Sequence, residues 1–231
     1  MGLRDGAPIG IVYFAISFAF GLTAVSMGLR VTEALAISVF NLTSAGQIAA
    51  LPIISAQGSL IELALIQLVI NARYSLMSIA IAPKFDKSIR TRDKFILAFS
   101  VTDEMFAVAI GKNQILGKKY VYSLMIMPFL GWTLGTLFGA IAGNILPGII
   151  VTALGISMYA MFIAIIVPPA KKSLKITLAI LISVLLSCLF EYVSPLAKIP
   201  DGFAIIITVL TAASVMALIA PIKDEEKCAN E

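Results

Sequence analysis

Three ionisable residues of this chain lie inside apolar segments. Arg73 lies in the apolar segment 60–82, and Asp103 and Glu104 lie in the apolar segment 95–111. A charge near the centre of a bilayer costs at least ~2.5–3.5 kcal/mol, so such residues usually line a polar pathway or pair with each other. Arg73 could hold a carboxylate, and one acid could pair with it while the other binds an ammonium group or carries a proton. This chemistry is typical of a transporter.

A polar stretch interrupts a second apolar segment, 33–54. Residues 41–47 read Asn-Leu-Thr-Ser-Ala-Gly-Gln. Glycine weakens a helix, and hydroxyl side chains can satisfy the backbone groups that a break sets free, so we predict a broken helix that suits a substrate carboxylate. An unbroken helix whose polar residues bond to neighbouring helices is the alternative. The predicted substrate-binding residues are Asn41, Ser44, Gly46, Gln47, Asn71, Arg73 and Tyr74.

The composition indicates an integral membrane protein. Of the 231 residues, 60% are hydrophobic and 13% are charged, whereas soluble domains carry about 25% charged residues. The apolar runs are continuous and ~17–25 residues long, which suits helices rather than the alternating strands of a barrel. We predict an all-α, polytopic helical membrane protein that forms a single transmembrane domain over residues 1–231.

The apolar segments fall into full spans and defective ones. Eight can be distinguished, at 8–29, 33–54, 60–82, 95–111, 119–143, 149–169, 174–193 and 202–221. We predict six full spans plus two broken or re-entrant elements, 33–54 and 95–111, that enter from opposite faces. A chain with seven or eight full spans is the alternative. A broken element followed by a full span would then occur twice, as 33–54 with 60–82 and as 95–111 with 119–143. The two copies would have opposite orientations in the membrane, as in transporters built from inverted repeats.

Basic loops determine the predicted orientation. Lysine and arginine concentrate in the loops 84–94, 112–119 and 171–175. All three loops lie on one side only if 95–111 is re-entrant, and basic loops favour the cytoplasmic side. We therefore predict a multi-pass protein of the bacterial cytoplasmic membrane with both termini in the cytoplasm.

Glycines recur every fourth residue in the span 119–143. The stripe consists of Gly131, Gly135, Gly139 and Gly143. Such a stripe lets another helix approach closely. It predicts tight packing against another span or against a second subunit.

Several classes of function are disfavoured. The chain has no histidine, which argues against a Ser–His–Asp triad, a haem site or a zinc site. It also lacks a Gly-x-x-x-x-Gly-Lys-Ser/Thr loop for nucleotide phosphates. We expect a transporter rather than an enzyme, with no cofactor, no metal and no nucleic-acid partner.

These segments resemble the AzlC family, the large subunit of bacterial branched-chain amino-acid exporters. The resemblance covers Gly2 to about Pro169. It rests on Gly2-Leu-Arg-Asp-Gly6, Phe18-Ala-Phe-Gly21, Ser44-Ala-Gly-Gln47, Ile70-Asn-Ala-Arg73 with Ala82-Pro83, Thr102-Asp-Glu104, and Trp132-Thr-Leu-Gly135. The usual family pattern has His where this chain has Tyr74, and an aromatic residue where it has Ile48.

The resemblance implies a secondary exporter of branched-chain amino acids, driven by the proton gradient. It also implies a small hydrophobic membrane subunit of the AzlD type, which could dock on the glycine stripe. The alternatives are a solute-binding subunit or permease of an ATP-driven transporter, and a pore.

Overall fold

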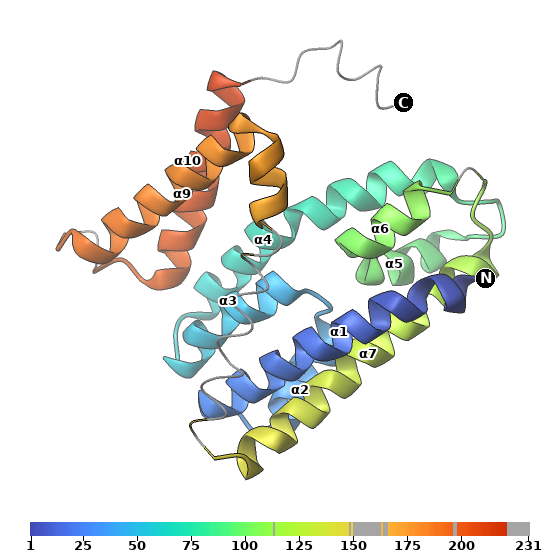
Figure 1. Ribbon diagram of the computed structural model, residues 1–231, viewed down its shortest axis with the longest axis horizontal. Coiled ribbons are helices and arrows are strands. Elements are labelled where there is room, and N and C mark those ends of the chain that lie inside the picture. Colours follow the sequence, from blue (N-terminus) through green and yellow to red (C-terminus); the bar gives the residue numbers. More distant parts are fainter. Residues whose placement is uncertain (113, 148, 150–162, 164–165, 196–197, 221–231) are drawn as a thin grey trace. The chain divides into compact units, whose positions relative to one another are not determined.

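The computed structural model consists of helices joined by loops over the part of the chain that it describes (Figure 1). It describes residues 1–112, 114–147, 149, 163, 166–195 and 198–220. The helices are α1 (Gly2–Ser26), α2 (Val31–Phe40), α3 (Ser44–Ser55), α4 (Leu60–Ile81), the short η1 (Ala82–Lys84), α5 (Thr91–Ser100), α6 (Asp103–Ile110), α7 (Lys118–Ile145), α9 (Leu174–Tyr192) and α10 (Asp201–Ile219). No β-strand occurs within the described ranges.

Five helical segments are long and apolar enough to cross a membrane. They are α1, α4 continued by η1, α7, α9 and α10. They match the predicted spans 8–29, 60–82, 119–143, 174–193 and 202–221, so the predicted all-α polytopic architecture is confirmed. Most of the one remaining predicted full span, 149–169, lies outside the described residues.

Both predicted broken elements are interrupted helices. Segment 33–54 forms α2 and α3, separated by residues 41–43, and segment 95–111 belongs to α5 and α6, separated by residues 101–102. We call residues 41–43 the first tip and residues 101–102 the second tip.

The chain divides into two compact units. The first contains Met1–Gly58 and Ile70–Tyr159, and the second contains Ser59–Val69 and Ala160–Glu231. The first unit holds both broken elements together with α1, α7 and the second half of α4. In the second unit, α9 and α10 pack together, and the Glu62 carboxylate accepts a hydrogen bond of 2.8 Å from the Gly202 N–H at the start of α10.

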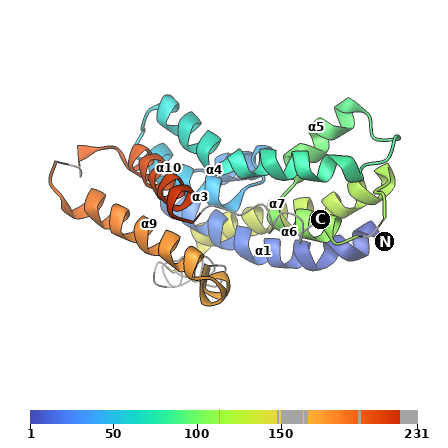
Figure 2. The same ribbon diagram turned by 90° about the horizontal axis from the view of Figure 1, so that it is seen from above.

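The frame of the first unit is the parallel pair α1 and α7 (Figure 1, Figure 2). Gly131 contacts Gly10, and Gly139 contacts Phe18, so the residue numbers rise together along both helices. A Cβ atom on Gly139 would lie 2.0 Å from the Phe18 carbonyl oxygen, and one on Gly131 would lie 2.1 Å from that of Gly10. Only glycine allows the two backbones to approach this closely.

The glycine stripe of α7 therefore faces α1 of the same chain. Glycines of α1 also contribute, since Gly2 and Gly6 lie against residues 120–128 of α7 in the same way. This contact occupies the face that could have received a second subunit. A small membrane partner would have to dock elsewhere.

The first broken element is a hairpin that opens at the carboxyl end of the α1–α7 pair. Its second arm returns to the end of α1, where the Ser55 hydroxyl donates to the Met27 carbonyl oxygen at 3.0 Å. The first arm also contacts α7, where the Ser38 and Thr136 hydroxyls are 2.7 Å apart and share a hydrogen bond. The element thus enters and leaves at one end of the frame.

The second broken element opens at the opposite, amino end of the same pair. Lys112, just after α6, forms an ion pair of 2.8 Å with Asp5 in the first turn of α1. Asp93, in the first turn of α5, forms one of 2.7 Å with Lys118 at the start of α7. The first arm of this hairpin therefore begins, and the second arm ends, at the amino end of the frame.

The direction of α4 agrees with two re-entrant hairpins. Tyr74 lies beside Thr43 of the first tip, at 3.4 Å, whereas Phe85 pairs with Leu116 near the start of α7. The second half of α4 therefore runs antiparallel to α1 and α7. If both broken elements crossed the membrane, α4 would run parallel to α1, so the re-entrant arrangement is favoured over seven or eight spans.

The first helix of each hairpin has the same N-terminal capping interaction. Helices α2 and α5 have 10 residues each, and each follows an arginine whose N–H donates to an acid three residues later. Arg30 N–H donates to Glu33 at 2.8 Å, and Arg90 N–H donates to Asp93 at 2.9 Å. Such capping satisfies a donor that the first helical turn leaves without a partner.

The α1–α7 contact predicts a difference between two glycines of one stripe. Gly139→Ala must push α1 and α7 apart, and overpacking of this kind costs about 1–3 kcal/mol. Gly143→Ala meets its nearest neighbour at 3.4 Å and should change stability little. Both variants gain the same helix propensity. We expect a lower thermal midpoint for Gly139→Ala alone, followed in detergent by the fluorescence of Trp132. Equal midpoints would contradict the close contact.

Asp93 predicts an acid-dependent loss of stability. Its side chain is only 5% exposed. The hydrogen bond from Lys118, followed by that from the Arg90 N–H, lowers the pKa of Asp93 from 3.8 to about 2. Because the folded pKa is the lower one, the stabilisation is complete above about pH 4 and is lost as the pH falls toward 2.

We therefore expect Asp93→Asn to lower the thermal midpoint at pH 7, with a difference from the parent protein that shrinks between pH 4 and 2. Glu33→Gln is the matched control, because Glu33 occupies the same position of the first hairpin but is 52% exposed. A difference that stays constant with pH would refute the assignment.

Candidate functional site

The two hairpin tips meet beside the middle of the α1–α7 pair. Leu42 of the first tip and Met105, just after the second tip, share one apolar cluster with Tyr13 and Trp132. The rings of Tyr13 and Trp132 meet edge to face, with centroids 5.3 Å apart. This cluster fixes the tips against the frame, so the polar residues next to them are held at defined positions.

Arg73 joins α4 to the second tip. Its Nη1 atom lies 2.9 Å from Oδ2 and 3.1 Å from Oδ1 of Asp103, the first residue of α6. Both side chains are 49% exposed. The pair therefore forms at an accessible edge of the unit, where a second carboxylate could compete with Asp103 for the guanidinium group.

Tyr74 extends this contact to the first tip. Its hydroxyl accepts a hydrogen bond of 3.1 Å from Arg73 Nη2 and shares another, of 3.4 Å, with the Thr43 hydroxyl. Thr43 also accepts from the Gly46 N–H at 3.4 Å, as the N-cap of α3. A continuous series of polar contacts thus runs from Thr43 through Tyr74 and Arg73 to Asp103.

Glu104 has a different partner from Asp103. It accepts a hydrogen bond from the Tyr13 hydroxyl of α1, and the Tyr13 side chain is buried. Adjacent residues on a helix point about 100° apart, which lets one acid contact α4 and the other contact α1. We call Tyr13, Thr43, Arg73, Tyr74, Asp103 and Glu104 the tip cluster.

The helix ends at the tips add partial charges of both signs. Helices α3 and α6 begin there and direct N–H groups toward the tips, whereas α2 and α5 end there with carbonyl groups. Asp103 and Glu104 lie in the first turn of α6, where the helix dipole favours negative charge. The cluster therefore combines a cation, two acids, and backbone donors and acceptors, a set that matches both charged groups of an amino acid.

The remaining predicted residues have varied positions. Gln47 is fully buried; its Nε2 donates to the Asn41 carbonyl oxygen, and its Oε1 accepts from Ser38 at 3.5 Å. In this conformation Gln47 holds the first tip in shape instead of facing a ligand. Ser44 starts α3, and Asn71, which is partly buried, precedes Tyr74 by three residues on α4.

The four predicted glycines lie in the α1–α7 contact rather than in the tip cluster. Within the described ranges, no group of three or more His, Cys, Asp or Glu residues could hold a metal ion.

Tyr13, Thr43 and Thr102 were not among the site residues predicted from the sequence. Thr102 precedes α6 as its N-cap and is buried. A threonine directly before each restarted helix, at 43 and at 102, is a sequence signal for an N-cap that could have marked both tips. Thr43 makes the capping hydrogen bond, whereas the Thr102 side chain makes none. No comparable signal marks Tyr13, because a tyrosine in an apolar span is common.

Comparison with known proteins gives consistent matches. The chain is 31% identical over 172 residues to an uncharacterized membrane protein of Archaeoglobus fulgidus, covering 74% of this chain and 75% of the relative. It is 28% identical over 188 residues to the inner membrane protein YgaZ of Escherichia coli, covering 78% and 77%. No solved structure matches significantly.

The profile of the family described as AzlC protein matches residues 8–146. These residues include most of α1 and all of α2 to α7, and therefore both hairpins and the whole tip cluster. The matched segment is more than half of the chain, so this membrane protein belongs to the AzlC family.

Proposed function

We propose that this protein is a secondary active exporter of branched-chain and similar apolar amino acids, coupled to protons. It works in the bacterial cytoplasmic membrane with both termini in the cytoplasm. The relative YgaZ, which is named an inner membrane protein, supports this location. Family membership supports amino-acid transport, and the tip cluster supports the mechanism.

One observation carries the proposal. The ion pair of Arg73 with Asp103 lies where the tips of the two hairpins come together. The two hairpins open at opposite ends of the α1–α7 pair. Secondary transporters place the substrate at interrupted helices of this kind, near the middle of the membrane. A site at this depth can be reached from either side when one hairpin or the other moves.

The tip cluster can bind both ends of an amino acid. Arg73 takes the substrate carboxylate in place of Asp103, because a guanidinium group has planar donors that match a carboxylate. Asp103 or Glu104 then takes the ammonium group. The substrate side chain is apolar, as are the neighbouring residues Leu42 and Met105.

Proton coupling follows from competition between the substrate ammonium group and a proton. An ammonium group held by Asp103 lies next to Glu104 and disfavours a proton there, whereas Glu104 is neutralised by a proton when the empty site crosses the membrane. The protein therefore carries an amino acid in one direction and a proton in the other. An inward proton gradient drives export by this exchange.

A small hydrophobic membrane subunit of the AzlD type is part of the proposal. It would bind an apolar surface other than the glycine face of α7, since α1 covers that face. An ATP-driven transporter and a pore are the rival functions. Flux that requires ATP would favour the first, and flux without saturation or stereospecificity would favour the second.

Substitutions at Arg73 and Asp103 test the site. In reconstituted vesicles, we expect Arg73→Lys and Asp103→Asn each to lower leucine counterflow by about tenfold or more, the effect of losing about 1.4 kcal/mol of binding. Arg30→Lys is the matched control, because Arg30 forms a similar pair with Glu33 at the mouth of the first hairpin. Unchanged counterflow in both site variants would remove the tip cluster from the mechanism.

Glu104 tests the coupling separately from binding. Leucine added to one side of the vesicles should move protons in the parent protein, as reported by a trapped pH-sensitive dye. We expect Glu104→Gln to keep leucine exchange within about threefold of the parent and to lose most leucine-driven proton movement, because a neutral amide cannot bind a proton. Normal proton movement in both Glu104→Gln and Asp103→Asn would exclude these acids as the proton carriers.

A further inference from the structure

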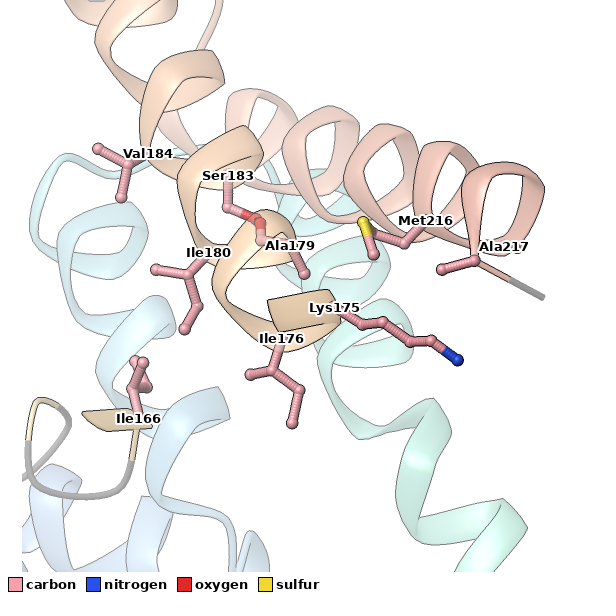
Figure 3. A pocket seen from close by; sticks show the side chains of 10 residues that line it. Ile166, Lys175, Ile176, Ala179, Ile180, Ser183, Val184, Met216 and Ala217 are labelled. Carbon is pink, nitrogen blue, oxygen red and sulfur yellow. The ribbon is translucent and has the colours of Figure 1, made fainter. Parts of the chain in front are cut away.

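The second unit contains an apolar groove, and none of the residues that line it belongs to the tip cluster. It lies along α9 and the end of α10 and has a volume of about 870 Å³ (Figure 3). Its walls include Ile176, Ile180 and Val184 of α9 and Met216 and Ala217 of α10. The groove is open to the outside of the unit, and both helices are apolar enough to cross a membrane.

The groove has an apolar floor and one charged end. The Ser183 hydroxyl donates to the Ala179 carbonyl oxygen at 2.9 Å, so it is satisfied within α9. Lys175, in the first turn of α9, lines the groove at the end where α10 finishes (Figure 3). Lys171 and Lys172, which are exposed, precede it closely along the chain.

The described acids of this pair of helices lie away from Lys175. Glu191 lies in the last turn of α9 and Asp201 is the first residue of α10, and the exposed Lys198 lies between them along the chain. The basic end of the groove is therefore not neutralised by these acids. It would attract an anion that lies at the level of the lipid headgroups.

The length of the groove distinguishes between possible occupants. From Lys175 to Val184 the α9 backbone rises ~14 Å, which is close to half of the ~30 Å hydrocarbon thickness. A membrane helix of a partner protein would need the full thickness. The groove matches the acyl region of one leaflet, with the lysines at its polar boundary.

We propose that this groove binds an anionic phospholipid. An acyl chain lies along Ile176, Ile180 and Val184, and the phosphate contacts Lys175 together with Lys171 and Lys172. A lysine near an anionic lipid contributes about fivefold in affinity, so the three together provide selectivity over a zwitterionic lipid. This assignment is independent of the transport proposal.

The test is lipid binding by the full-length protein in detergent, measured by native mass spectrometry. Phosphatidylglycerol and phosphatidylcholine of identical acyl composition are compared. We expect the parent protein to prefer phosphatidylglycerol by about tenfold or more. The triple variant Lys171→Gln, Lys172→Gln and Lys175→Gln should lose this preference. The matched control replaces Lys87, Arg92 and Lys119 with Gln, since they are exposed cations of the first unit, and should keep it.

A second variant tests the groove itself. Ala179→Phe fills the apolar floor without changing any charge, and it should weaken phosphatidylglycerol binding by about as much as the lysine variant. Equal binding of both lipids by the parent protein would overturn the proposal. So would retained preference in both variants, or a change of oligomeric state in Ala179→Phe without a change in lipid binding.

Discussion

The free-energy cost of exposing charged side chains to lipid determines how the elements of the first unit are arranged. A guanidinium group and two carboxylates can remain near the centre of a membrane only if each has a partner, and Arg73, Asp103 and Glu104 each have one. Those partners come from different elements, so the elements must be held together at one point. The two hairpins, α1 and α4 supply that point, and the parallel glycine contact of α1 with α7 supplies the frame behind it.

The interrupted helices were predictable because polar or charged residues occur at each break within an apolar segment. The polar residues from Asn41 to Gln47 indicated the first break, and adjacent acids in an apolar run indicated the second. The basic loops then gave the re-entrant orientation, since charge placement in loops is governed by the membrane and not by packing. For these features local sequence was enough.

Other parts of the site depend on long-range packing and left no local trace. Nothing near Tyr13 shows that its hydroxyl reaches Glu104, 91 residues later. Gln47 has the type and position of a ligand contact, yet its amide is used to hold the tip. The glycine stripe gave the presence of a close contact but not its partner, because a stripe describes one face only. Its partner in α1 emerges only when the two helices are paired in register.

The two hairpins are alike in form but differ in charge. Each starts with an arginine and an acid three residues later, and each restarts after a threonine. The first tip is neutral, with Asn41 and Thr43, whereas the second is followed at once by Asp103 and Glu104. Inverted repeats that kept the same charges would place like charges together at the centre. The asymmetry avoids that repulsion and leaves both acids at the second tip.

The contacts of α4 bear on how the site could open. Each hairpin is anchored to α7 by its own bonds, Ser38 to Thr136 for the first and Asp93 to Lys118 for the second. The two tips are joined through α4, whose Tyr74 contacts Thr43 and whose Arg73 contacts Asp103. A ligand carboxylate that takes Arg73 from Asp103 weakens the link to the second tip and leaves the Tyr74–Thr43 link to the first in place. Under the proposed mechanism, binding at the guanidinium group therefore favours release of one hairpin over the other, which is the asymmetry that alternating access requires.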